Sequence, residues 1–239
     1  MKLAYALSFA LLLASSPVFA HSVWLQPGKE GKLVIENGDA GEPSDPYDPE
    51  RITQSWAVDK DGKPAPVVVE RAEKSAALKP HPAVAITAAL FDNKYWAKGQ
   101  DGKWNNGPKG TVTNPTIAGP SYKYPKMILQ QTAGFAVPLG LGLEIVPLSD
   151  PFTLKPGDKL TVQVLLQGKP LAGADVVEDL YIHHDAKPKK VKTDAEGKAV
   201  LVIAKRPYAG IEVSHFAKQE GSAVEGTFYN ASLGFPVKQ

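Results

Sequence analysis

Short apolar segments separated by turn-forming residues constrain the fold of this chain more than any other feature. In one of them, Leu160, Val162 and Val164 alternate with polar residues, which is the period of a strand with one buried face. Pro156-Gly157-Asp158 precedes the segment and Gly168-Lys169-Pro170 follows it, and both are typical turn sequences. No convincing amphipathic helix interrupts the series. The pattern predicts an all-β protein built as a β-sandwich.

The same reasoning predicts further strands along the chain. They are Ser22–Leu25, Leu33–Ile35, Gln54–Val58, Val67–Val69, Ala83–Leu90, Phe91–Lys98, Leu143–Val146, Ala174–Ile182, Ala199–Ile203, Ile211–Phe216 and Thr227–Val237. Tyr122–Phe135 leaves a short helix and a strand both open. Residues 99–120 are mostly polar and predict a long loop insertion, which in a compact domain is usually functional or disordered.

The roughly 220 residues that follow the first twenty suffice for one or two β-sandwich domains of Ig-like or transthyretin-like type. A stretch rich in proline and glycine, Val137-Pro138-Leu139-Gly140, suggests a boundary. It divides residues 21–137, an N-terminal β domain carrying the long loop at about 99–120, from residues 138–239, a C-terminal β-sandwich domain.

Residues 1–20 have the three parts of a secretory signal peptide. Lys2 is the basic start, Leu3–Ala14 is apolar, and Val18 and Ala20 are small residues at the positions that signal peptidase reads. The apolar run is shorter than the ~20 residues of a stable membrane span, although an uncleaved anchor is the alternative. We expect cleavage after Ala20 and an exported, periplasmic protein that does not span the membrane.

The amino-acid composition excludes several classes of partner and of metal site. The chain has 27 basic and 25 acidic residues, and removal of Lys2 with the signal leaves 26 − 25 = +1. This balance argues against a nucleic-acid partner. There is no cysteine, and Met127 is the one methionine after residue 20, so thiolate sites and methionine-rich copper(I) sites are excluded.

Cleavage after Ala20 makes His21 the first residue of the mature chain. A terminal histidine carries two nitrogens that can bind one metal ion, its α-amine and its imidazole. Both groups lose protons near neutral pH, because their ordinary pKa values are about 7.7–8 and about 6.5. The residue is therefore a candidate chelate for a divalent transition metal that prefers nitrogen.

Three other histidines are candidate ligands. His215 has the strand parity of Ile211 and Val213 and so points to the more apolar face, where it is either a buried neutral histidine or a ligand facing His21. His183 and His184 are adjacent at a strand end and point to opposite faces, so at most one of them serves an inward site; a solvated strand end is the alternative.

Several segments together resemble the exported proteins described as the substrate-specific component of nickel or cobalt uptake. They are His21-Ser22-Val23-Trp24-Leu25, Phe91-Asp92-Asn93-Lys94-Tyr95-Trp96, Leu143-Glu144-Ile145-Val146-Pro147, Asp150-Pro151-Phe152, Leu154-Lys155-Pro156-Gly157-Asp158, Gly168-Lys169-Pro170-Leu171-Ala172-Gly173-Ala174 and Thr193-Asp194-Ala195-Glu196-Gly197-Lys198. The resemblance implies a periplasmic β-sandwich protein that binds nickel or cobalt ion and works with a membrane metal-uptake component. His21 and His215 carry over as ligands.

The hypothesis is therefore a periplasmic binding protein for Ni²⁺ or Co²⁺, with Cu²⁺ or Zn²⁺ also able to bind, and not an enzyme. The sequence has no glycine-rich phosphate loop, His-Glu-x-x-His helix or Gly-x-Ser-x-Gly elbow. A terminal histidine with a second histidine also resembles the copper brace of polysaccharide monooxygenases, which makes a copper enzyme the second hypothesis. The third is a metal-free β module that uses the aromatic residues in 91–124 to contact protein or glycan.

Overall fold

The computed structural model describes residues 21–182 and 188–238, and they form an all-β structure of packed sheets, as the sequence predicts. Helical structure in these ranges is limited to 3₁₀ turns: η1 (Lys29–Gly31), η2 (Pro49–Arg51), η3 (Ala133–Ala136) and η4 (Pro151–Thr153). No helix in the described ranges combines the length and apolar composition that a bilayer crossing needs. The proposed signal peptide at residues 1–20 lies outside the described residues.

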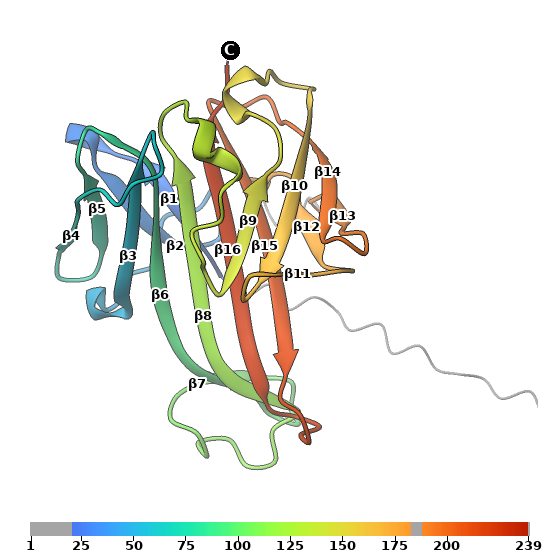
Figure 1. The fold of residues 1–239 in the computed structure, drawn as a ribbon. Coiled ribbons are helices and arrows are strands. Elements are labelled where there is room, and N and C mark those ends of the chain that lie inside the picture. The colour runs from blue at the N-terminus through green and yellow to red at the C-terminus, as the bar shows by residue number, and fades with distance from the viewer. Residues whose placement is uncertain (1–20, 183–187, 239) are drawn as a thin grey trace, which may run out of the picture.

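A long, curved sheet runs through the middle of the molecule (Figure 1). Its strands follow the order β13-β12-β15-β16-β8-β6-β3, and β7 pairs with β6 beside that path. Their bounds are β3 (Ile52–Asp59), β6 (Val84–Lys98), β7 (Trp104–Asn106), β8 (Ile117–Ile128), β12 (Asp175–Val177), β13 (Lys190–Lys192), β15 (Tyr208–Lys218) and β16 (Gly226–Pro236). We call it the long sheet.

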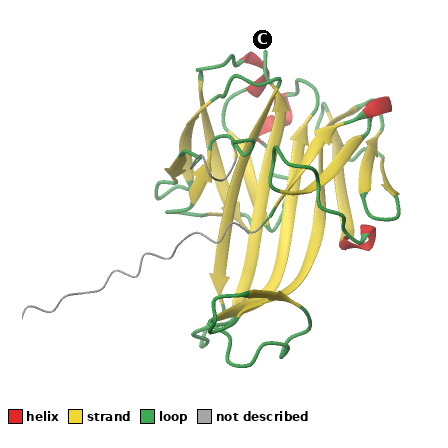
Figure 2. Cartoon of the chain, turned by 180° about the vertical axis from the view of Figure 1, so that it is seen from behind, coloured by secondary structure: helices red, strands yellow, loops and turns green. Residues whose placement is uncertain are grey.

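The long sheet crosses the predicted domain boundary. Residues 21–137 and 138–239 each supply strands to it, and the two sets meet where β8 pairs in parallel with β16, with Lys123 opposite Asn230. β6, β8, β15 and β16 are the long strands that extend below the rest of the fold, toward the loop that contains β7 (Figure 2). The two halves therefore share one sheet instead of folding around separate ones.

A smaller sheet packs on each face of the long sheet. The N-terminal sheet has the order β1-β2-β5-β4, with β1 (Ser22–Pro27), β2 (Leu33–Gly38), β4 (Val67–Arg71) and β5 (Ala76–Pro80). The β10 sheet contains β9 (Leu143–Pro147), β10 (Lys159–Leu166), β11 (Lys169–Pro170) and β14 (Lys198–Val202). The result is a sandwich-like arrangement with the long sheet as the middle layer.

Two hydrophobic cores fill the two interfaces. The core behind the N-terminal sheet contains Val23, Leu25 and Ile35 from that sheet, with Phe91 and Met127 from the long sheet. The larger core on the other face joins the long sheet to the β10 sheet; it includes Ile86, Tyr124, Leu143, Leu160, Val162, Val164, Leu201, Ile211, Val213, Leu233 and Phe235. The alternating residues that predicted the β10 strand are among those buried here.

Two predicted strands, Ala83–Leu90 and Phe91–Lys98, are one strand in the structure. β6 runs through both, and its pairing with β8 shifts register between Asp92 and Tyr95. Lys94 adopts a φ of 65°, and its backbone N–H donates to the Asp92 carboxylate at 2.9 Å. A β-bulge of this kind bends a strand without ending it. The polar residues Asp92 and Asn93, near the junction of the two predicted strands, therefore lie at a bend in one continuous strand.

One ion pair is fully enclosed between the long sheet and β9. The Lys126 ammonium donates to Glu144 Oε1 at 2.8 Å, and the two side chains are 3% and 1% exposed. The same carboxylate accepts from the backbone N–H groups of Leu139, Gly140 and Leu141. Burial lowers the pKa of Lys126, and the Glu144 charge opposes that shift. Glu144 therefore fixes the 139–141 turn and neutralises a buried cation.

We expect Glu144→Gln to lower the free energy of unfolding by about 3–5 kcal/mol, because the amide leaves a buried ammonium without its counter-charge. Urea unfolding at pH 7 measures the change. Asp175→Asn is the matched control: its partner Lys192 lies 2.7 Å away, but the side chains are 49% and 69% exposed, so the loss stays below about 1 kcal/mol. Equal losses in the two variants would contradict the role assigned to Glu144.

Candidate functional site at the start of the first strand

β1 has a neighbouring strand on one side only, because β2 is its sole partner in the N-terminal sheet. Its free edge faces the long sheet, which satisfies the exposed carbonyls with side chains. The Lys123 ammonium donates to the His21 carbonyl, and the Ser232 hydroxyl donates to the Val23 carbonyl at 2.8 Å. These bonds fasten the beginning of β1 to strands β8 and β16.

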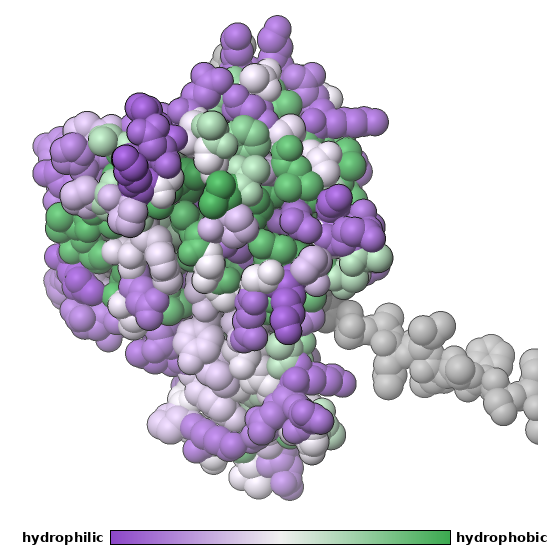
Figure 3. All heavy atoms as spheres, in the orientation of Figure 1, coloured by the Kyte–Doolittle hydropathy of each residue, from purple (hydrophilic) through white to green (hydrophobic). Residues whose placement is uncertain are grey.

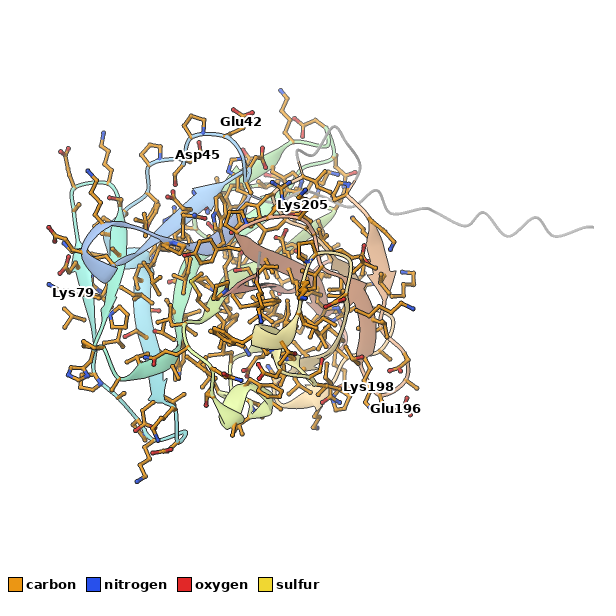
Figure 4. The ribbon with its side chains drawn as sticks, turned by 90° about the horizontal axis from the view of Figure 1, so that it is seen from above. Glu42, Asp45, Lys79, Glu196, Lys198 and Lys205 are labelled. Atoms are coloured by element: carbon orange, nitrogen blue, oxygen red, sulfur yellow. The ribbon has the colours of Figure 1, made fainter. Side chains whose placement is uncertain are left out.

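The His21 side chain meets a carboxylate from the loop that follows β2. Its Nδ1 atom lies 2.9 Å from Asp45 Oδ2, and the two side chains are 55% and 49% exposed. Figure 4 shows Asp45 and Glu42 on this loop. The Asp45 N–H donates to the Asn37 carbonyl at 2.7 Å, and Gly38, with a φ of 135°, lets the chain turn back toward the strand. The loop therefore holds Asp45 beside His21, the residue that precedes β1.

A cation is buried next to His21. Lys123 is 2% exposed, although its ammonium contacts the His21 carbonyl. Burial is the main reason that the pKa of Lys123 is lowered to about 8; Glu212 and Asp45 act against this shift, and the Arg51 charge adds to it. Keeping a charged group here costs stability that an apolar side chain of the same length does not.

Side chains from β15 and β16 complete a polar cluster around the start of β1. Glu212 Oε1 accepts from the Ser22 hydroxyl at 2.6 Å and from Asn230 Nδ2 at 2.5 Å. Asn230 Nδ2 also donates to the Ser214 hydroxyl at 3.0 Å. Its Oδ1 is buried without a hydrogen-bond partner in the described residues. With Lys123, these groups form what we call the terminal cluster: Ser22, Lys123, Glu212, Ser214 and Asn230.

The structure does not bring His215 to His21. Glu212 and Ser214 reach Asn230 and Ser22, so the even-numbered side chains of β15 point toward the N-terminal sheet. His215 is opposite Tyr229 and shares the parity of Val213, which is buried against the β10 sheet. The two histidines therefore lie on opposite faces of the long sheet, which corrects the expectation that His215 faces His21. Burial lowers the pKa of His215 and favours its neutral form.

His183 and His184 lie outside the described residues. The chain just before them packs beside β1: Tyr181 and Leu180 cluster with Trp24 and Ala40, and the Tyr181 hydroxyl donates to Gln26 at 3.4 Å. Across residues 21–182 and 188–238, no three side chains of His, Asp or Glu converge as a metal site. At this end of the described residues, the His21 imidazole and the Asp45 carboxylate are in contact.

Three aromatic residues of the long loop and its flanks, Trp104, Tyr122 and Tyr124, pack on aromatic rings of β16. Trp104 lies edge-on to Phe228 with centroids 5.5 Å apart, and Phe228 is 4.6 Å from Phe216. On the opposite face, Tyr122 and Tyr229 are 6.4 Å apart. These contacts match the structural role that is common for such residues.

A groove of about 560 Å³ lies elsewhere, between β3 and the segment around η3. Its lining includes Trp56, Val58, Pro64, Val137 and Leu139. Hydrophobic side chains gather over the upper part of the face shown in Figure 3, and the lower tip is mostly polar. His21 and His215 are not among the described residues that line this groove.

Sequence reasoning missed the partners of His21. Asp45 lies in the stretch Gly38–Pro49, whose glycine, proline and aspartate residues indicate only a loop. Lys123 lies in a segment whose secondary structure the sequence leaves open, and Glu212 follows it by 89 positions. One signal for Lys123 was available: it lies between two tyrosines in the segment that forms β8, and a lysine is rarely buried unless it has a partner.

The chain belongs to the family described as Domain of unknown function (DUF4198), which it matches over residues 18–217. It is also similar to a protein of Haemophilus influenzae described as uncharacterized. The two are 27% identical over 172 residues, which cover 72% of this chain and 73% of that protein. The matched residues include strands of all three sheets, β1 and the loop that carries Asp45, and they end before β16.

The lowered pKa of Lys123 predicts how the free energy of unfolding changes with pH. Between about pH 8 and the unfolded pKa of about 10.4, the unfolded lysine holds a proton that the folded one has lost, so this residue's contribution rises with pH. We expect the free energy of unfolding of the native protein, minus that of Lys123→Met, to increase by about 2 kcal/mol from pH 7 to pH 10. Paired urea titrations measure it; a pH-independent difference would contradict the burial of this ammonium.

Proposed function

We propose that the protein is an exported binding protein for a divalent transition metal, nickel or cobalt, and that the metal binds at the His21 terminus after cleavage behind Ala20. The observation that carries the proposal is the 2.9 Å separation between His21 Nδ1 and Asp45 Oδ2. The protein then works in the periplasm as a carrier that supports uptake, not as an enzyme.

The chemistry of the terminus supports a chelate. In a terminal histidine, the α-amine and Nδ1 close a six-membered ring around one metal ion, and Nδ1 is the nitrogen that faces Asp45. Two ligands bound at about 2.1 Å and at right angles are about 3 Å apart, which is the separation of Nδ1 and the carboxylate oxygen. The amine, imidazole and carboxylate can therefore share an ion with little movement of the side chains.

The donor set favours a metal of intermediate softness. Two nitrogens and one oxygen suit Ni²⁺, Co²⁺ and Zn²⁺, and Cu²⁺ binds such sites more tightly than Ni²⁺, so supply in the compartment decides which ion is carried. His183 or His184 remains a proposed additional ligand. We further propose that the metal passes to a membrane uptake component.

The two other hypotheses receive less support. A copper brace made of His21 and His215 is disfavoured, because His215 points to the other face of the long sheet. A metal-free module built on the aromatic residues in 91–124 requires an exposed platform, but Trp104 packs edge-on against Phe228 of β16. Neither alternative gives a role to the pairing of His21 with Asp45.

An extra glycine before His21 tests the chelate. The extension turns the α-amine into an amide and leaves the folded chain unchanged, so we expect the affinity for Ni²⁺ to fall by at least about 100-fold in calorimetry. The comparison protein begins at His21, as intact-mass analysis verifies. Equal affinities would remove the terminus from the site.

Substitution of the carboxylate tests the third donor. We expect Asp45→Asn to weaken Ni²⁺ binding by at least about tenfold, because a neutral amide is a poorer ligand than a carboxylate. His215→Ala is the control, and we expect a change below about twofold because this histidine lies on the opposite face. The reverse result, with His215→Ala as the damaging change, would contradict the proposed position of the site.

A further inference from the structure

The long sheet satisfies the carbonyl of His21, just before β1, and the carbonyl of Val23, within β1, by different means. Ser232 serves the Val23 carbonyl with a neutral hydroxyl at 2.8 Å. Lys123 serves the His21 carbonyl with an ammonium that is buried among groups such as Phe91, whose ring centroid is 6.0 Å from Nζ. A neutral hydroxyl is sufficient to satisfy a carbonyl. The need for a hydrogen bond therefore does not by itself account for a buried charge next to His21.

The orientation of a terminal residue depends on few torsions. Rotation about the Cα–C bond of His21 sets the direction of its α-amine relative to the strand, and rotation about Cα–Cβ sets its imidazole. Lys123 fixes the first by holding the carbonyl, and Asp45 limits the second through Nδ1. Glu212 holds the neighbouring Ser22 hydroxyl at 2.6 Å, which steadies the next residue.

We propose that Lys123 is a positioning residue for the metal site: it clamps the carbonyl of His21 so that the α-amine and Nδ1 are held in chelating orientation beside Asp45. This inference rests on the proposed function. Lys123 does not touch the metal; it lowers the entropy that the terminal residue loses on binding, which is how preorganisation raises affinity. Groups that orient a metal ligand typically contribute about 10- to 100-fold in affinity.

The test measures Ni²⁺ affinity by calorimetry on protein that begins at His21. Lys123→Met keeps the length of the side chain and removes the charge and the donor, and we expect its Kd to rise by about 10- to 100-fold. Lys123→Arg retains a donor and is expected to recover part of the loss. Ser232→Ala removes the matched bond to the Val23 carbonyl and is expected to change Kd by less than about twofold.

Two further readouts separate positioning from a general effect on folding. The Cu²⁺ electron paramagnetic resonance spectrum reports ligand geometry, and we expect it to change in Lys123→Met and not in Ser232→Ala. In a glycine-extended protein the amine is already blocked, so Lys123→Met is expected to cause no additional loss of Ni²⁺ affinity there.

The outcomes distinguish the two proposals. Native affinity and an unchanged spectrum in Lys123→Met would overturn the positioning role and leave the proposed function intact. An equal loss in the extended protein, or an equal loss in Ser232→Ala, would also overturn it, because the effect would not act through the terminal amine. Absence of Ni²⁺ binding by the native protein that begins at His21 would overturn both.

Discussion

The bond from the buried Lys123 ammonium to the His21 carbonyl is the contact on which the proposed site depends. β1 is an edge strand, and an edge strand leaves a row of carbonyls without partners. Here the neighbouring long sheet supplies those partners from its side chains, so β1 lies across strands with which it does not pair. His21 and the start of β1 are consequently held by side chains of the long sheet.

The three-layer arrangement explains why residues far apart in sequence meet at this terminus. β16, near the end of the chain, pairs in parallel with β8 and brings Asn230 next to Lys123. β15 then places Glu212 within reach of Ser22, a separation of 190 positions along the chain. The residues on the two sides of the predicted boundary near residue 137 therefore supply strands to one shared sheet. Both halves of the chain therefore contribute side chains to the surroundings of His21 and Ser22.

The strands were predictable where burial on one face imposed an alternating pattern, as at Leu160, Val162 and Val164. The parity of His215 was also readable, since it correctly indicates the more apolar face. Parity does not reveal which face of the long sheet a distant strand covers. β1 packs on the face opposite to the one that His215 points to, so the expected pairing of His215 with His21 was wrong. Asp45 was not predictable because only the tertiary path of its loop brings it to His21.

Cobalt(II) added to isotopically labelled protein that begins at His21 tests the location of the site most directly, because this paramagnetic ion shifts and broadens nuclear magnetic resonance signals near it. The account predicts that the amide signals of Val23 and Asp45 are affected first, at one equivalent of metal. It also predicts that those of His215 and Tyr229, on the far face of the long sheet, change least. Strong effects centred on His215, or none at any residue, would contradict a metal site at the start of β1.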